Sequence, residues 1–237
     1  MCGRFVVADP GVRFVSEIDP DIIADDLPEP SFNVAPTQQA AIVACSTRTD
    51  PPTRRVVSAR WGLVPGWAKD LSAGARAINA RSETAATKRT FSSALHARRA
   101  VVPVSGFYEW QERDGEKTPQ YIHPQDGGPL LLAGLYEWWR DPARAQDDPA
   151  RWVLSFTILT RAAEGPLAAL HPRMPVFVDV DHARAWLDPS ADDPSSALDA
   201  CVADAPREAR RLAWHAVDAR VGSVRHDDPA LIVPVAS

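Results

Sequence analysis

The hydrophobic positions of this chain fall mostly in short runs, and one run alternates with a period of two residues. Trp152, Leu154, Phe156 and Ile158 are separated by single residues, which is typical of a strand with one buried face. Similar short runs predict strands at Arg4–Val7, Ala41–Cys45, Val56–Trp61, Ala100–Val104, Phe107–Gln111, Leu130–Glu137, Trp152–Thr160, Val176–Val178 and Leu212–Val217.

Helical patterns are fewer. Residues Ser82–Arg98 predict a helix because apolar side chains recur four positions apart among small residues. A second helix is predicted at His182–Leu187, with Asp181 as its N-cap and Pro189 just beyond its end. Because strands and helices do not alternate regularly, a parallel βαβ sheet is disfavoured. We predict an α+β fold with a mostly antiparallel, barrel-like curved sheet and a few flanking helices.

Length and composition favour a single domain over residues 1–237. The 237 residues are 45% hydrophobic and 24% charged, as in an ordinary globular protein. Residues 187–206 are interpreted as a surface insertion with a short helix, and residues 141–150 as a polar loop. The longest apolar run, Pro129–Trp139, is shorter than the ~18 residues of a membrane span. The N-terminal residues are charged where a signal peptide would be apolar, so we expect the protein to be cytoplasmic. We also expect it to be a monomer.

The net charge of −5 argues mildly against a nucleic-acid partner, but the charges are unevenly distributed. Residues 51–100 hold 10 basic and 2 acidic residues, whereas residues 1–50 hold 3 basic and 8 acidic ones. A basic segment in an acidic chain is able to form a local anion site. Within it, Arg76 and Arg81 are candidates for phosphate contacts, and Trp67 is a candidate for stacking on single-stranded bases. Each is also compatible with a purely structural role.

Cys2 is the first candidate for chemistry. The three cysteines are scattered and form neither a disulfide framework nor a zinc pattern. Met1 is removable before a small side chain, which would leave Cys2 with a free α-amine of pKa ~8 and a thiol of pKa ~8.5 in the unperturbed state. Such an amine forms a Schiff base with an aldehyde, and the thiol then closes a five-membered thiazolidine. The alternative is a small buried residue near the chain end.

Three further polar residues lie in motifs that suit catalysis. Glu109 stands among bulky aromatic residues, a setting that favours general acid or base work. His171 is flanked by prolines on a loop that would hold a proton-transfer group rigidly. Asn33 leads into a proline-containing turn. Each also has a structural interpretation. The chain has no P-loop, GxGxxG, HExxH or EF-hand pattern, so we expect no cofactor and no metal.

Eight short blocks together resemble the SOS response-associated peptidase (SRAP) family. They follow the family's order from residue 1 towards the tail Pro229–Pro234. The blocks are Met1–Arg4, Phe32–Gln38, Trp61–Pro65, Asn79–Thr84, Gly106–Trp110, Ala133–Leu135, Phe156–Thr160 and His171–Val176.

The resemblance implies that Met1 is removed and that Cys2 attacks the ring-opened aldehyde of an abasic site in single-stranded DNA. The implied product is a thiazolidine cross-link that shields the lesion from strand breakage and error-prone bypass. Members are also described as peptidases, partly because they remove their own Met1. The partner would be single-stranded DNA, with no cofactor or metal, and the protein would be nucleoid-associated when bound.

The resemblance also assigns roles to single residues. Asn33 would position the N-terminus or the sugar, Glu109 would transfer protons, and His171 would assist near the deoxyribose. The residues that would line the DNA groove are Arg4, Trp67, Asn79, Arg81 and Thr160. The chain departs from the family at Val217-Asp218, where many members have Val-Asn, and this weakens any role for the C-terminal segment.

Two other functions stay open from the residues alone. One is a cysteine peptidase in which Cys2, His171 and Asn33 act as nucleophile, base and orienter. The other is a non-catalytic single-strand binding module that uses Trp67 and Arg81.

Overall fold

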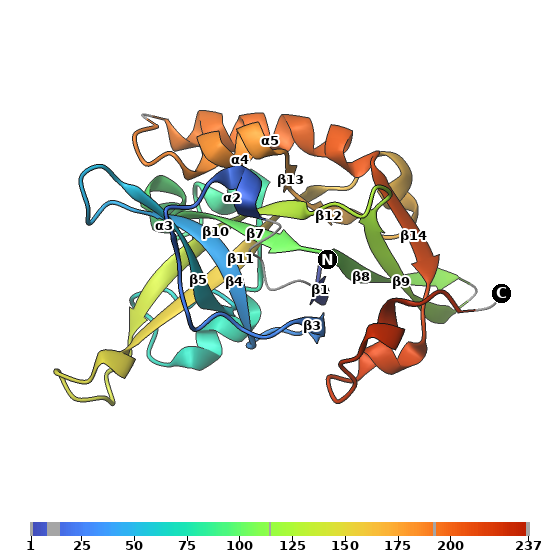
Figure 1. Cartoon of the computed structure of the whole chain (residues 1–237), viewed down its shortest axis with the longest axis horizontal. Coiled ribbons are helices and arrows are strands. Elements are labelled where there is room, and N and C mark those ends of the chain that lie inside the picture. Colours follow the sequence, from blue (N-terminus) through green and yellow to red (C-terminus); the bar gives the residue numbers. More distant parts are fainter. Residues whose placement is uncertain (1, 9–14, 114, 192, 236–237) are drawn as a thin grey trace.

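The strands of the chain form two mostly antiparallel sheets (Figure 1). The computed structural model describes residues 2–8, 15–113, 115–191 and 193–235. The larger sheet has nine strands. They are β2 (Ile22–Ile23), β4 (Gln39–Ser46), β5 (Thr53–Trp61), β6 (Asn79–Arg81), β7 (Arg99–Val104), β10 (Leu130–Arg140), β11 (Trp152–Ala162), β12 (Arg173–Pro175) and β13 (Phe177–Val178).

Part of the larger sheet closes on itself. Neighbouring strands pair antiparallel in the order β5, β4, β7, β10, β11. The ring is completed by a parallel contact in which Ser155 and Phe156 of β11 lie opposite Arg60 and Trp61 of β5. Closure removes the exposed edges of these five strands. The predicted barrel-like, mostly antiparallel sheet is therefore confirmed, although the closing contact is parallel.

The smaller sheet holds the N-terminus. Its five strands lie in the order β14 (Leu212–Ala216), β9 (Glu116–Pro124), β8 (Gly106–Arg113), β1 (Phe5–Val7) and β3 (Ser31–Val34). Phe5 lies opposite Val34 on one side and Phe107 on the other. The first strand of the chain is thus held from both sides, and this fixes the position of the residues that precede it.

Each predicted strand is present, with ends shifted by a few residues. The strands that were not predicted are β2, β3, β6, β9 and β12. Four of them have only two to four residues, too few for a visible period. In β9 two prolines, Pro119 and Pro124, hide the strand because proline is rare inside sheets.

The predicted helix Ser82–Arg98 is wrong as a single element. The structure has α2 (Ser82–Ala85) and α3 (Ser92–Ala97), separated by a turn in which Thr87 N and Lys88 N both donate to Thr84 O. Residues 86–90 offer no large apolar side chain to bury, and threonine is a weak helix former. The apolar side chains four positions apart, Phe91 and Leu95, therefore lie at the N-cap of α3 and within it.

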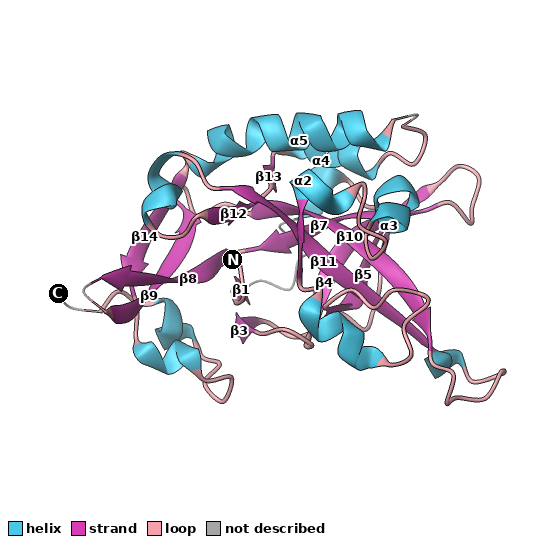
Figure 2. Ribbon diagram, turned by 180° about the vertical axis from the view of Figure 1, so that it is seen from behind, coloured by secondary structure: helices cyan, strands magenta, loops and turns pink. Residues whose placement is uncertain are grey.

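Two helices cover one side of the barrel, at the top of Figure 1 and, seen from behind, of Figure 2. The first, α4 (Val180–Leu187), is capped by Asp179, whose side chain accepts from His182 N, so Asp181 is not the cap. The second, α5 (Pro194–Ala209), has 16 residues. The interpretation of residues 187–206 as a surface insertion with a short helix is therefore wrong.

The apolar face of α5 explains this correction. Leu198, Cys201 and Ala205 are spaced at helical intervals and are at most 5% exposed, so they pack into the core. In sequence they are hidden among Asp, Ser and Pro. Residues 141–150 form the tip of the β10–β11 hairpin and, as predicted, are a polar loop. No helix in the described part of the chain is long and apolar enough to cross a bilayer.

Candidate active site

Cys2 lies just before β1, where contacts from both sheets reach the chain. Tyr108 N of β8 donates to Arg4 O at 2.9 Å, which fixes the backbone just after Cys2. From the other sheet, Asn79 Nδ2 donates to Cys2 O at 2.8 Å. Cys2 is fully buried. Cys2 is therefore fixed by backbone and side-chain contacts. Met1, whose removal the resemblance implies, lies outside the described residues.

Burial raises the pKa of the Cys2 thiol well above its usual value, and the negative charge of Glu109 adds to this effect. Glu109 is itself 6% exposed and lies opposite Gln120 in the β8–β9 pair. At neutral pH the thiol thus keeps its proton. The sulfur can react only after another group has accepted this proton. Glu109 is a candidate acceptor, because its negative charge acts on the Cys2 thiol.

His171 lies on the loop before β12. Its Nδ1 is 2.9 Å from the backbone nitrogen of Arg173 and 3.1 Å from the backbone oxygen of the same residue. Whichever tautomer is present, Nδ1 is engaged by this backbone and the ring orientation is set. The predicted role of His171 in proton transfer stays a prediction.

Arg173 and Glu83 form a charged pair that the sequence analysis missed. The guanidinium donates to both carboxylate oxygens of Glu83, at 2.6 and 2.9 Å, and this hydrogen bonding lowers the pKa of Glu83 to about 2. Arg173 also donates to Thr160 O at 2.7 Å. The pair thus ties β12 and β11 to the start of α2. Its only sequence signal was the position of Arg173 two residues after His171.

Thr160 is fully buried. Its hydroxyl donates to Ala80 O at 3.4 Å and lies 3.3 Å from an Arg173 nitrogen. The expectation that Thr160 lines a DNA groove is not compatible with this burial, because its side chain has no surface to offer. It supports Arg173 and β6 instead.

Asn33 and Arg4 both donate hydrogen bonds to residues 221–226, near the C-terminal end of the chain. Arg4 donates to Asn33 Oδ1 at 2.7 Å and to Val221 O at 2.8 Å. Asn33, 2% exposed, donates through Nδ2 to the carbonyls of Val221, Ser223 and His226, at 3.3, 3.1 and 2.7 Å. Burial also lowers the pKa of Arg4. These contacts hold β1, β3 and residues 221–226 together, so Asn33 acts on the N-terminus through Arg4.

The other predicted DNA contacts are more accessible. Trp67 is 54% exposed, and the Arg89 guanidinium lies 4.9 Å from its ring centroid. Arg76 and Arg81 are exposed, at the end of the 3₁₀ turn Leu71–Arg76 and at the N-cap of α2. Asn79, by contrast, donates its amide to the Cys2 carbonyl, so the structure brings it to Cys2.

One group of described residues has the spacing of a metal site: Asp179, His182 and Asp204. His182 Nδ1 lies 2.9 Å from Asp179 and 3.6 Å from Asp204. Arg207 also approaches both carboxylates, at 3.7 and 3.4 Å. A cation there would meet the positive charge of Arg207. We interpret the group as an ion-pair network that joins α4 to α5.

These features, with the closed barrel and the buried cysteine at position 2, define a class of protein. The chain matches the family described as SOS response associated peptidase (SRAP) over residues 1–224 and belongs to it.

Relatives of known name share most of the chain. It is 33% identical to the abasic site processing protein YoqW of Bacillus subtilis, covering 98% of this chain and 99% of that one. It is 30% identical to the abasic site processing protein YedK of Escherichia coli, over 99% and 100%. It is also 30% identical to the abasic site processing protein HMCES of Gallus gallus, over 91% and 69%. A crystal structure of a protein from Bacteroides thetaiotaomicron shares the fold with a TM-score of 0.78 and 20% identity, over 99% and 100%.

Proposed function

We propose that this protein processes abasic sites in single-stranded DNA by joining Cys2 covalently to the lesion. The observation that carries the proposal is the setting of Cys2: a buried residue at the chain's N-terminal end, hydrogen-bonded through Asn79 and beside the charge of Glu109. The resemblance of the chain to named abasic site processing proteins supports it. The cross-link would shield the lesion during the response to DNA damage.

The reaction balances with one water released. After removal of Met1, the α-amine of Cys2 adds to the aldehyde carbon of the opened sugar and gives a carbinolamine. Glu109, which has taken up the proton that the α-ammonium group released when it became the attacking amine, donates this proton to the hydroxyl group. The hydroxyl leaves as water and a protonated Schiff base forms. The sulfur then adds to the imine carbon, its proton leaves to the Glu109 carboxylate, and the ring nitrogen becomes an amine. One carboxyl thus acts as acid and then as base.

Reversal would use the same groups. A thiazolidine has no imine for water to attack, so it must reopen before the DNA is released. By microscopic reversibility Glu109 would protonate the departing sulfur. His171, with its ring held by Arg173, would assist at the deoxyribose, where a proton is needed on the sugar oxygen.

The DNA would be held mainly by charge and stacking. Trp67 offers an exposed indole, and Arg76, Arg81 and Arg89 offer exposed guanidinium groups. Such contacts tolerate any sequence and weaken with salt. Arg4 and Thr160 would contribute indirectly, through β1 and through Arg173.

The cysteine peptidase alternative finds less support. Its Asn33 would have to orient the imidazole of His171, as an orienting side chain does in such an arrangement. Both ends of the Asn33 amide are instead committed, to Arg4 and to three carbonyls of residues 221–226. Self-removal of Met1 remains part of the proposal, whereas cleavage of other proteins does not.

The test is incubation with a single strand that carries one abasic site, followed by a denaturing gel. We expect a protein–DNA band that survives heat. The matched control is the same strand after borohydride has converted its aldehyde to an alcohol, which should give no band. Equal bands on both strands, or none on either, would contradict the proposal. Cleavage of an added protein substrate would favour the peptidase instead.

A further inference from the structure

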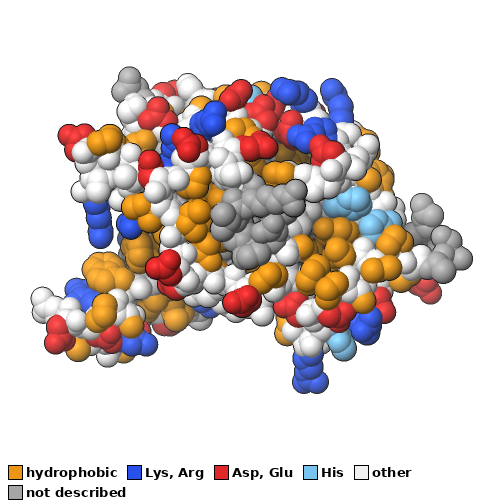
Figure 3. All heavy atoms as spheres, in the orientation of Figure 1, with side chains coloured by type: hydrophobic (Ala, Val, Ile, Leu, Met, Phe, Trp, Pro, Cys, Tyr) orange, Lys and Arg blue, Asp and Glu red, His pale blue; other side chains and the backbone are white. Residues whose placement is uncertain are grey.

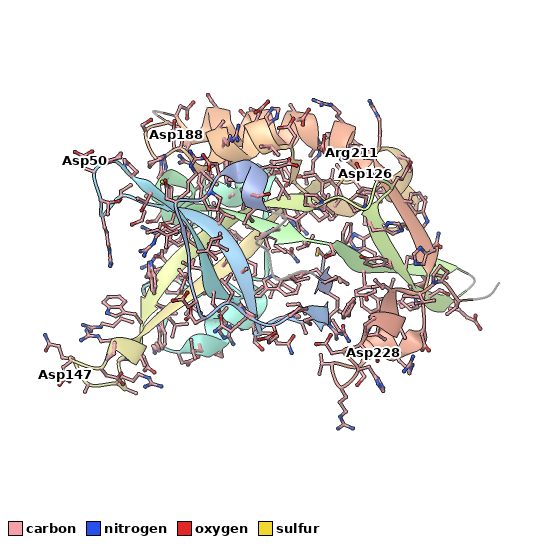
Figure 4. The ribbon with its side chains drawn as sticks, viewed as in Figure 1. Asp50, Asp126, Asp147, Asp188, Arg211 and Asp228 are labelled. Carbon is pink, nitrogen blue, oxygen red and sulfur yellow. The ribbon has the colours of Figure 1, made fainter. Side chains whose placement is uncertain are left out.

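The barrel has an open end that the proposed reaction does not use. Away from their closing contact, the β4–β5 and β10–β11 hairpins diverge, since β5 and β11 pair only at Arg60–Trp61 and Ser155–Phe156. Figure 4 labels Asp50 and Asp147 near the two hairpin tips, which lie apart on the same side of the molecule. A cleft of about 300 Å³ lies between the hairpins, and Ala97 and Arg98 close it at the end of α3.

The cleft combines a basic rim with an aromatic and apolar floor. Its guanidinium groups are those of Arg48, Arg55 and Arg98, and none of its twelve lining residues is acidic. Trp138, 42% exposed, faces into it beside Leu154. Figure 3 shows hydrophobic side chains with basic ones at the edges of the notch on the left of the molecule.

This lining contrasts with that of the cleft beside α5. That cleft, of about 240 Å³, is lined by four carboxylates (Glu17, Asp126, Asp179 and Glu208) and a single arginine, Arg211. In a chain with 31 acidic and 26 basic residues, a cleft with three arginines and no acidic lining residue favours anions. Glu137 pairs with Arg98 at 2.8 Å, but the Nε of Arg98 is enclosed and has no acceptor among the described residues.

We propose that this cleft, which we call the hairpin cleft, binds a second nucleotide unit of the DNA strand held at the Cys2 site. Arginine is suited to phosphate, because its planar fork donates two parallel hydrogen bonds. An exposed indole above apolar side chains is suited to a nucleobase, because every base has a face that stacks. The ligand chemistry is thus a nucleotide, and the source is the same DNA strand. This inference rests on the proposed function only for the choice of DNA as partner.

Two arginines flank α3 between the Trp67 turn and the hairpin cleft. The turn that carries Trp67 lies against β10, where Trp139 Nε1 donates to Ala68 O at 2.8 Å. Arg89 stands over Trp67 just before α3, and Arg98 follows α3 directly. The six residues of α3 span about 9 Å at 1.5 Å per residue, a distance that one or two nucleotides bridge. The basic segment 51–100 supplies both of these arginines.

The test compares two DNA lengths and a set of variants. Anisotropy would measure binding of unmodified single strands, one short enough to fill only the Cys2 site and one roughly three times longer. The variants are Arg55→Ala and Trp138→Ala. Matched controls are Arg210→Ala and Trp152→Ala, exposed residues of the same types outside the cleft. Cross-linking of a short abasic strand would be measured in parallel.

We expect the long strand to bind more tightly than the short one. Trp138→Ala should weaken long-strand binding about tenfold, and Arg55→Ala should lower the salt slope by about 0.7. Both should leave short-strand cross-linking unchanged, as should the controls. Long-strand binding that is the same in all variants would overturn the inference. Loss of short-strand cross-linking in wild type would instead count against the proposed function.

A free nucleotide is the other source of the same chemistry. Titration with deoxyadenosine monophosphate separates the two sources. If this nucleotide binds in a manner that depends on Trp138 while DNA length has no effect, the cleft takes a free nucleotide, and the claim that the strand reaches it is overturned. Weak nucleotide binding together with the length effect supports the claim.

Discussion

Two cysteines of this protein are buried to almost the same degree, yet only one has the surroundings of a nucleophile. Cys2 is 0% exposed and Cys201 is 2% exposed. Burial raises the pKa of both thiols, and nearby carboxylates raise it further: Glu109 for Cys2, Asp179 and Asp204 for Cys201. The Cys201 thiol has a pKa of about 12. Thiol acidity therefore does not distinguish the reactive site from the core.

The two cysteines differ in the groups that surround each sulfur. Cys201 lies on the inner face of α5 with Leu198 and Ala205, where it fills space. Cys2 lies just before the first strand, its carbonyl accepts a hydrogen bond from Asn79, and removal of Met1 would place an amine beside the thiol. In the proposed reaction the α-amine attacks first and a proton acceptor then activates the sulfur, so a thiol that is buried and protonated at rest is compatible with it.

Exchanging each cysteine for alanine should separate the two regions most strongly. Cys2→Ala keeps an N-terminal amine but loses the sulfur, so it can form only a hydrolysable Schiff base. We expect no heat-stable cross-link on a denaturing gel with abasic single-stranded DNA. Cys201→Ala should cross-link at the wild-type rate. Equal cross-linking by the two variants would remove Cys2 from the reaction.

The carboxylate next to Cys2 gives the second-largest effect. Glu109→Gln keeps the shape but cannot transfer protons, and loss of a general acid–base group slows reactions about 10²–10⁴-fold. Single-turnover rates of cross-link formation and reversal should both fall. Glu112→Gln, an exposed change further along β8, is the control. Unchanged rates in Glu109→Gln would show that another group moves the proton.

Two asparagines allow a finer comparison. Asn79→Ala removes the hydrogen bond to the Cys2 carbonyl and should slow cross-linking roughly tenfold with little change in melting temperature. Asn33→Ala removes four hydrogen bonds, one from Arg4 and three to the carbonyls of residues 221–226. It should lower the melting temperature by about 5 °C. If both variants lost only stability, Asn79 would have no role in orienting the nucleophile.

The smallest effect concerns stability at high pH. The folded Cys201 thiol holds its proton up to a pKa of about 12, whereas an unfolded thiol loses it from ~8.5 upward. The unfolded state therefore binds fewer protons in this window, and stability falls as pH rises, by at most ~1.4 kcal/mol per pH unit. Cys201→Ala should flatten this fall in denaturant midpoints between pH ~8 and ~10. An unaltered slope would contradict the burial argument.

The sequence predicted the barrel well because its long strands, such as β10 and β11, carry strong hydrophobic runs. It failed where packing came from distant partners. The helix α5 looked like a surface insertion because the apolar positions Leu198, Cys201 and Ala205 are diluted by polar residues, and the core they pack into comes from elsewhere in the chain.

The site was predicted in part. Cys2, Glu109, His171 and Asn79 stood in distinctive blocks, and the structure places Glu109 and Asn79 at Cys2. It could not be seen from sequence that Arg4 and Asn33 bind residues 221–226, or that Thr160 is buried under Arg173, because these contacts join residues up to 217 positions apart. The pairing of Glu83 with Arg173 was missed for the same reason.

The central claim is that Cys2 reacts through both its amine and its sulfur. Intact mass spectrometry of the protein before and after reaction with abasic single-stranded DNA tests it most directly. We predict a protein that lacks Met1 and a conjugate whose mass is the sum of protein and DNA less one water, unchanged by borohydride because a closed thiazolidine has no imine to reduce. A conjugate that retains Met1, or one that gains two hydrogens with borohydride, would contradict the account.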